Sequence, residues 1–216
     1  MTAAPVTRLF LVRHGATTLT AEDRFAGATD APLSDIGREQ ARLLSERLKH
    51  AEIAAAYASP LARTMATARI IAGPHALEVE PRTELREISH GRWEQLTRHE
   101  VEAKFPDEAA AWEEDPYTFA PEGGESGLMV TARALPVLLQ IVRAHPGGKV
   151  LVVSHKATLR VLTCALLGVD VNLFRVRIGM PVASVTVFEW KKAGPLLVRL
   201  GDVSHLPPHL AEAEGT

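Results

Sequence analysis

Cysteine is nearly absent from this sequence of 216 residues, which contains only Cys164. No internal disulfide can form, and such a chain is typical of a reducing compartment. Cys164 lies within the apolar run VLTCALL, which favours a small core residue over a reactive thiol. The first residues, MTAAPVTR, lack the apolar core of a signal peptide, and no segment is expected to reach the length of a membrane span. We therefore expect a cytoplasmic protein with no membrane partner.

An excess of charge of one sign is also lacking, because 24 Lys and Arg residues against 26 Asp and Glu residues leave a net charge of −2. Overall charge thus gives no reason to expect a nucleic-acid partner. The sequence contains no GxxxxGKS/T phosphate loop, no GxGxxG after a strand, and no HExxH or CxxC motif. The sequence therefore has none of these motifs, which are typical of nucleotide-binding folds and zinc sites. Any affinity for anions must come from local clusters of side chains.

The apolar pattern that is present predicts an α/β fold. Strands are expected at residues 9–12, 53–58, 149–154, 184–190 and 197–200. Helices are expected at about 34–48, 61–71, 128–142 and 157–167, the third kinked or broken at Pro136. Because strands alternate with helices, we predict a mainly parallel central sheet with helices on both faces. We also expect one domain over residues 1–216, with a small cap-like insertion at about 88–127 and a frayed tail at about 206–216.

Charged and titratable side chains follow three of the predicted strands. Arg13 and His14 come directly after the first strand. Arg63 follows the second strand, and His155 follows the strand at 149–154. In open α/β sheets, ligands bind beyond the carboxyl ends of the strands, so we expect these four side chains to meet at one edge.

Taken singly, each of these histidines would be a structural residue and each arginine a solvated surface charge. Two guanidiniums and two imidazoles can share a buried pocket only around an anion, and phosphate suits the paired donors of arginine. A metal is the rival use of two histidines. Adjacent arginines would repel a divalent cation, and no metal-binding spacing accompanies the histidines, so we expect no metal.

Six segments, read together, resemble the histidine phosphatase superfamily, the phosphoglycerate-mutase-like proteins. The segments are LVRHGATT, RFAGATDAPLSDIGREQA, YASPLARTMATA, LREISHGRWEQL, PEGGES and VVSHKATLRVL. They occur in the family's order and run from about Leu9 to Leu167, which is most of the chain. RHG alone would be a weak signal, but its combination with SPLxR, a Glu before GxWE, and SH after a buried strand is specific. The resemblance implies the phosphatase branch.

The resemblance also implies roles for the matching residues. His14 corresponds to the histidine that accepts the phosphoryl group, and Arg13 and Arg63 correspond to the arginines that hold the phosphate. His155 corresponds to the second histidine of the pocket, which contacts the phosphoryl oxygens. We expect His14 to attack as a neutral imidazole, with its other ring nitrogen held by a backbone carbonyl. No metal or organic cofactor is required for this chemistry.

Two further matches and two departures concern the proton donor and the substrate. Glu87 corresponds to the proton donor, because it alone, unlike the nearby Glu84, is followed by GxWE. Gly27 corresponds to a glycine beside the substrate. Two positions depart from the family pattern: Thr20 stands where Asn is frequent, and Lys156 stands where Gly is common. Lys156 is either a solvated residue at a helix start or a contact to a second anionic group of the substrate.

The predicted function is a metal-independent phosphomonoesterase that hydrolyses a small phosphorylated metabolite through a phosphohistidine. One alternative is a cofactor-dependent phosphoglycerate mutase, and another is a non-catalytic phosphate-binding scaffold. The mutase is disfavoured because the stretch at 97–126 lacks an Arg-Arg pair and contains Glu113, Glu114 and Asp115. The scaffold is disfavoured because all five catalytic positions are filled. The physiological substrate and the oligomeric state stay open.

Overall fold

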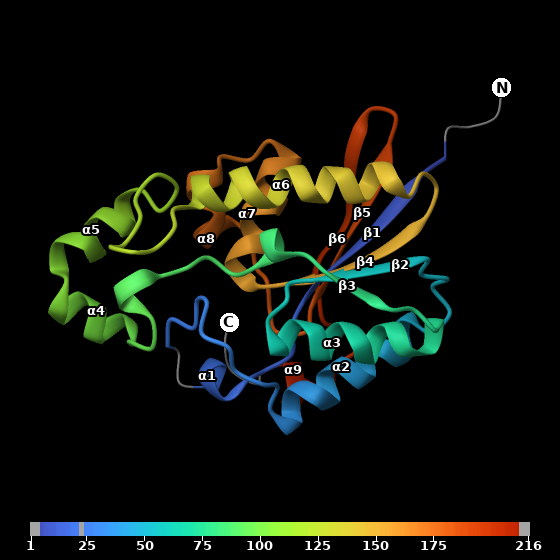
Figure 1. The fold of residues 1–216 in the computed structure, drawn as a ribbon, viewed down its shortest axis with the longest axis horizontal. Helices are drawn as coiled ribbons and strands as arrows, with labels where there is room; N and C mark the ends of the chain where they lie inside the picture. Colours follow the sequence, from blue (N-terminus) through green and yellow to red (C-terminus); the bar gives the residue numbers. More distant parts are fainter. Residues whose placement is uncertain (1–4, 22–23, 212–216) are drawn as a thin grey trace.

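A computed structural model describes residues 5–21 and 24–211, with the side chains of residues 20 and 21 outside that description. Within these residues a six-stranded sheet has the order β3-β2-β4-β1-β5-β6 (Figure 1). The strands are β1 (Thr7–Arg13), β2 (Ala55–Ala58), β3 (Val79–Pro81), β4 (Lys149–Ser154), β5 (Val185–Lys191) and β6 (Gly194–Asp202). Strands β1 to β4 pair in parallel, whereas β5 is antiparallel to β1 and β6. The predicted mainly parallel sheet is therefore confirmed.

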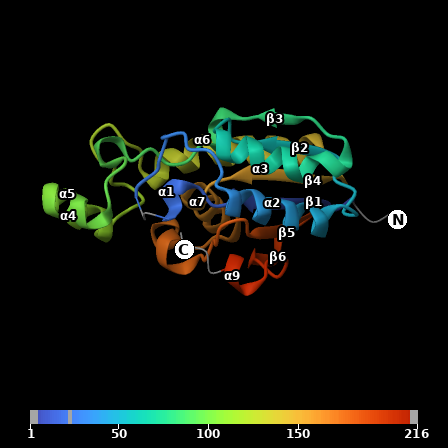
Figure 2. The same cartoon turned by 90° about the horizontal axis from the view of Figure 1, so that it is seen from below.

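Helices cover both faces of this sheet. One face carries α2 (Asp35–Leu48) and α3 (Ala62–Ala72), and the other carries α6 (Gly127–Ala144) and α7 (Lys156–Leu167), as Figures 1 and 2 show together. Successive residues of β1 enter opposite cores: Leu9 and Leu11 pack with α6 and α7, whereas Phe10 and Val12 pack with α2 and α3. A strand covered on both faces needs apolar residues at every position, which explains the uninterrupted run in the sequence.

Local signals set several helix boundaries as expected. The side chain of Ser34 accepts a hydrogen bond from the backbone N–H of Gly37 and so caps α2. Gly168 ends α7 in the left-handed conformation, at φ 66°. The helix was expected to be kinked or broken at Pro136, and the break is not found, because α6 is continuous from Gly127 to Ala144 with Pro136 inside it.

Helix α6 also corrects the expectation that no segment reaches the length of a membrane span. By length and composition alone, its 18 residues could cross a membrane. Its buried residues, which include Val130, Leu138 and Ile141, pack in the core beside the sheet. Arg133, on the same helix, pairs with Glu125 at 2.8 Å. The buried face of α6 is thus that of a core helix, whereas Leu128 and Met129 at its start are exposed.

The segment predicted as a weakly patterned insertion contains two regular helices, α4 (Arg98–Lys104) and α5 (Pro106–Glu114). Thr97 and Glu100 form a reciprocal capping box at the start of α4, and Pro106 occupies the first turn of α5. The two helices lie at one end of the molecule, away from α2 and α3 (Figure 1). They pack on a small core of their own around Trp93, Val101 and Trp112. We call residues 88–127 the cap.

The remaining elements are short. They are α1 (Thr18–Ala21), α8 (Phe174–Arg177), α9 (Pro208–Ala211), and 3-10 helices at Gly73–His75, Thr83–Leu85, Gly91–Trp93 and Val171–Leu173. The expected frayed tail differs from the structure over residues 206–211. Leu206 and Leu210 are buried with Ala183, and the Gln40 side chain donates to the Leu210 carbonyl at 2.9 Å. The rest of the expected tail, residues 212–216, lies outside the described residues.

Candidate active site

The ends of three adjacent strands bring the predicted site residues together. Strand β4 lies between β2 and β1, and Arg13 pairs in register with Ser154. The backbone N–H of His14 donates to the Ser154 carbonyl at 3.1 Å, which places His14 beside His155. Their ring centroids are 5.1 Å apart. The predicted meeting of these side chains at the carboxyl edge of the sheet is thus observed.

A cavity of about 540 Å³ opens in front of these strand ends. Its inner wall includes Arg13, His14, Gly27, Arg63 and Glu87. His155, which was expected to contact the phosphoryl oxygens, is fully buried and is not among the residues that line this cavity. The volume is that of a site for a small molecule.

His14 is held in one orientation by the loop that follows β1. Its Nδ1 lies 2.7 Å from the Gly15 carbonyl, an acceptor, so Nδ1 carries the proton and Nε2 keeps its lone pair. Burial lowers the pKa of His14 well below its usual value, and the charges of Arg63 and Arg13 lower it further. The ring is therefore a neutral imidazole at pH 7, with a nucleophilic nitrogen available.

Arg13 and Arg63 are buried guanidiniums tied to backbone carbonyls. Arg13 donates through Nη1 to the Met180 carbonyl at 2.7 Å, and its buried Nε has no partner among the described residues. Burial lowers the pKa of Arg13 to about 9, with Glu87 acting in the opposite direction. Arg63 donates to the carbonyls of Thr29 at 2.8 Å and Gly27 at 3.0 Å. Two cations held this way, with donors to spare, suit an anion in the cavity.

His155 supports Arg63. Its Nε2 lies 2.8 Å from the hydroxyl of Ser59, and its Nδ1 accepts from Nε of Arg63 at 3.3 Å. Because Nδ1 is an acceptor, the proton of the neutral ring is on Nε2 and is donated to Ser59. Burial, followed by the charge of Arg63, lowers the pKa of His155 well below its usual value. Ser59 was not identified from the sequence, although it is the first residue of the SPLxR segment.

Glu87 lies at the N-terminus of helix α7. Its Oε1 accepts from the backbone N–H of Thr158 at 3.0 Å and from the Thr158 hydroxyl at 3.1 Å. Oε1 also accepts from the N–H of Ile88 at 3.0 Å, whereas Oε2 accepts from the N–H of Ala157 at 3.2 Å. His155, the residue preceding α7, makes no side-chain cap, so Glu87 satisfies the free N–H groups of this helix from another segment.

Two of the three remaining predicted residues line the cavity. Gly27 lines the cavity with a left-handed φ of 46°. Lys156, the first residue of α7, also lines the cavity. The side chain of Thr20 lies outside the described residues. The geometry therefore places Gly27 and Lys156 where a substrate could reach them.

Residues 9–203 match the family model described as the histidine phosphatase superfamily, branch 1. The chain belongs to the histidine phosphatase superfamily. As predicted, the match covers most of the sequence.

Relatives within the superfamily agree with the phosphatase interpretation. The chain is 35% identical over 206 residues to phosphoserine phosphatase 1 of Hydrogenobacter thermophilus, covering 95% of this chain and 97% of the relative. It is 37% identical over 186 residues to the glucosyl-3-phosphoglycerate phosphatase of Mycolicibacterium vanbaalenii, covering 83% of this chain and 82% of the relative. The solved structure of Bacillus stearothermophilus YhfR is 35% identical, with a TM-score of 0.87, and covers 92% of this chain and 98% of that one. The names of the first two relatives are consistent with a small-metabolite phosphomonoesterase.

Glu94, the last residue of the GxWE sequence, connects the cap to the loop beside Arg63. Its carboxylate accepts from the backbone N–H of Ala28 at 3.0 Å and from the Thr29 hydroxyl at 3.0 Å. It also accepts from the backbone N–H of His90 at 3.3 Å. Glu94 thus ties the cap to the loop whose carbonyls hold Arg63. A side chain at Gly27 would collide with this carboxylate, since its Cβ would lie 2.4 Å from Glu94 Oε1.

The outer wall of the cavity contains four further basic residues, Arg24, Arg98, Arg160 and Arg175. Sequence reasoning considered Arg98 only as a weak contact for a second phosphate and missed the other three. Arg160 lies four residues after Lys156 on α7, a spacing that could have identified it as a neighbour on the same helix face. Of the acids that were expected to disfavour a second anion, Glu113 lines this cavity, whereas Glu114 and Asp115 are not among its lining residues.

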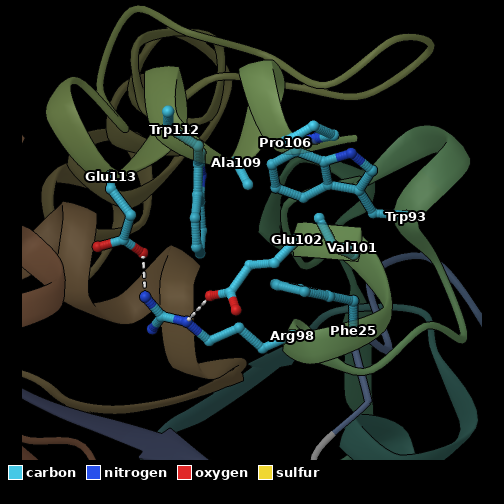
Figure 3. A pocket seen from close by; sticks show the side chains of 10 residues that line it. Phe25, Trp93, Arg98, Val101, Glu102, Pro106, Ala109, Trp112 and Glu113 are labelled. Carbon is cyan, nitrogen blue, oxygen red and sulfur yellow. Dashed lines mark hydrogen bonds and ion pairs between the residues drawn. The ribbon is translucent and has the colours of Figure 1, made fainter. Parts of the chain in front are cut away.

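A second, smaller cavity of about 250 Å³ lies within the cap (Figure 3). Its lining includes Phe25, Trp93, Val101 and Trp112. Trp112 borders both cavities, and the guanidinium of Arg175 stacks 3.5 Å from the centre of its ring. No group of three or more His, Cys, Asp or Glu residues arranged to hold a metal ion occurs in the described part of the chain.

Proposed function

We propose that the protein hydrolyses small-molecule phosphate esters through a phosphohistidine formed on His14. The observation that carries this proposal is the state of His14. The Gly15 carbonyl fixes the Nδ1–H tautomer, and burial beside two guanidiniums keeps the ring neutral. A neutral imidazole with a fixed lone pair is a competent nucleophile toward phosphorus. The proposed compartment is the cytoplasm, on the ground that the single cysteine is buried and unpaired.

In the first step, Arg13 and Arg63 hold the substrate phosphate through their remaining N–H donors. Phosphoryl transfer depends mainly on positioning and on neutralisation of charge, and both guanidiniums are fixed by carbonyls before substrate arrives. Nε2 of His14 bonds to phosphorus while the bond from phosphorus to the ester oxygen breaks. His155 acts by holding Arg63, and its own ring nitrogens are both in hydrogen bonds to protein.

Glu87 supplies the proton that the leaving oxygen needs. Oε2 is the oxygen that carries this proton in our proposal, because Oε1 has three of the four hydrogen bonds to the carboxylate. In the second step the ionised Glu87 takes a proton from water. The water oxygen bonds to phosphorus, the bond to His14 breaks, and inorganic phosphate leaves. The substrate proposed for these steps is a small phosphorylated metabolite, and Gly27 and Lys156 are proposed as its contacts.

The test is hydrolysis of a panel of phosphorylated metabolites, with 4-nitrophenyl phosphate as a general substrate and EDTA present throughout. We expect phosphate release from 4-nitrophenyl phosphate and from at least one metabolite. The Arg63→Met variant should lose about 100-fold or more in kcat/KM, since one of the two buried phosphate-binding cations is removed. A protein that releases no phosphate from any compound contradicts the proposal and favours the scaffold.

The mutase alternative needs its own assay. The protein is supplied with 3-phosphoglycerate and a trace of 2,3-bisphosphoglycerate, and both inorganic phosphate and 2-phosphoglycerate are followed. Phosphate release should exceed isomerisation, because Arg98 and Arg175, two arginines of the cavity that could hold a second phosphate, already donate to Glu113. Isomerisation that outruns phosphate release would replace the phosphatase assignment with the mutase.

A further inference from the structure

Arg160 enters the substrate cavity from helix α7, one turn after Lys156. Its Nε is buried and has no hydrogen-bond partner among the described residues. None of the ion pairs in the described part of the chain includes this guanidinium. Burial lowers the pKa of Arg160, and the charge of Glu87 opposes that shift most strongly. Buried donors are normally paired, so a guanidinium that lines the cavity without a partner among the described residues is available to a substrate.

The neighbouring arginines of the outer wall are already engaged with protein. Arg175 donates to Glu113 at 2.8 Å and stacks on Trp112. Arg98 donates to the same Glu113 at 2.6 Å and to Glu102 at 3.0 Å, as the dashed lines in Figure 3 show. These ion pairs fix both guanidiniums to the cap. No carboxylate among the described residues accepts a hydrogen bond from Arg160, which distinguishes it from Arg98 and Arg175.

We propose that Arg160 is a specificity residue that binds a carboxylate of the substrate, so that the preferred substrates are phosphate esters of short carboxylic acids. This inference rests on the proposed function and names its substrate class. The planar edge of a guanidinium presents two donors that match the two oxygens of a carboxylate. Arg98 and Arg175 already donate to Glu113, which leaves Arg160 to balance a further anionic group of the substrate, and one guanidinium matches the single charge of a carboxylate.

The N-terminus of α7 is not the proposed anion site, although it lies nearby. Its N–H groups at Ala157 and Thr158 already donate to Glu87. Arg160 lies about one helical turn, roughly 5 Å, farther along the same helix. The phosphate beside His14, the proton donor Glu87 and the carboxylate on Arg160 would thus follow one another along the cavity, as a short phosphorylated acid requires.

The test compares matched substrates that differ by one carboxylate. The first pair is phosphoserine and phosphoethanolamine, and the second is 3-phosphoglycerate and glycerol 3-phosphate. We expect the wild type to have the higher kcat/KM for the carboxylated member of at least one pair. In Arg160→Met, kcat/KM for that member should fall about 10- to 100-fold, the range for a lost hydrogen-bonded charge pair. The partner without the carboxylate and 4-nitrophenyl phosphate should change less than about threefold.

Two further variants separate specificity from structure. Arg160→Lys keeps the charge but offers no planar pair of donors, so it should restore only part of the preference. Arg143→Met removes an exposed arginine from the last turn of α6 and should alter neither member of a pair. Equal losses on both members of each pair in Arg160→Met would overturn the specificity role. A wild type that hydrolyses 4-nitrophenyl phosphate without preference for a carboxylate would overturn the substrate class and leave the phosphatase standing. No hydrolysis at all would overturn both.

Discussion

Removal of the Ser59 hydroxyl tests how the buried histidine pair is organised. In Ser59→Ala, the Nε2–H of His155 loses its partner at 2.8 Å. Either this donor stays buried and unsatisfied, or the proton moves to Nδ1. In the second case an N–H faces the Nε–H of Arg63 across 3.3 Å, and the two donors repel. Both outcomes disturb the guanidinium that binds the phosphate.

The size of the effect follows from the cost of a buried donor without a partner. That cost is about 1–3 kcal/mol, which corresponds to a loss of about 5- to 150-fold in kcat/KM if it falls on the active geometry of Arg63. We expect kcat/KM for 4-nitrophenyl phosphate to fall within this range. The ¹⁵N chemical shifts of the His155 ring should change, because the tautomer is no longer fixed.

The matched control is Thr163→Val, which also removes a fully buried hydroxyl. Thr163 donates to the Leu159 carbonyl at 2.7 Å inside α7, away from the histidines. Both variants should lower the free energy of unfolding by a similar amount, but only Ser59→Ala should lose activity. The reasoning is refuted if Ser59→Ala keeps kcat/KM within twofold of the wild type while its stability falls as in the control.

Three further predictions concern the proton donor, the substrate loop and pH. Glu87→Gln should lose more activity toward alkyl phosphates than toward 4-nitrophenyl phosphate, because a good leaving group needs little protonation; equal losses would argue against Glu87 as the acid. Gly27→Ala should lower both the melting temperature and kcat/KM. The left-handed φ of Gly27 costs alanine about 1–2 kcal/mol, and the new Cβ would collide with the Glu94 carboxylate. An unchanged melting temperature and kcat/KM would contradict this. The depressed pKa values of His14 and His155 mean that the unfolded state binds more protons below pH 6.5. The free energy of unfolding, measured in urea, should therefore be at its full value above pH 7 and fall between pH 6.5 and 5; a pH-independent value would show that these rings are not held neutral.

The parallel core of the fold was predictable because its signals are local. The strand at 149–154 agrees with β4 to the residue, since a strand buried on both faces is an unbroken apolar run. The edge strand β3 was missed because three residues, two of them exposed, give no apolar pattern. The cap helices were missed for a related reason, since α4 buries only Val101 and α5 only Trp112. The cap helices are held by tertiary contacts of a few aromatic residues, and the apolar periodicity of a sequence does not reveal such contacts.

The inner part of the candidate site was accessible from motifs, whereas its supports were not. Strand ends place Arg13 and His14 by topology alone, so a sequence pattern could identify them. The contacts of Ser59 with His155 and of Glu94 with the Gly27 loop join segments separated by 96 and by more than 60 residues. Such pairings depend on the folded chain. Arg160 was missed because a single arginine on a helix is usually a solvated charge, and only its burial distinguishes it.

Detection of phosphate on His14 tests the central proposal most directly. The protein is mixed rapidly with excess substrate, quenched in alkali, digested and analysed by mass spectrometry. We predict a phosphoryl group on the peptide that contains His14, stable in alkali and lost in acid, and no such group in His14→Ala, which should stay folded and inactive. A phosphorylated intermediate that persists in His14→Ala, or turnover by that variant at the wild-type rate, would contradict the account.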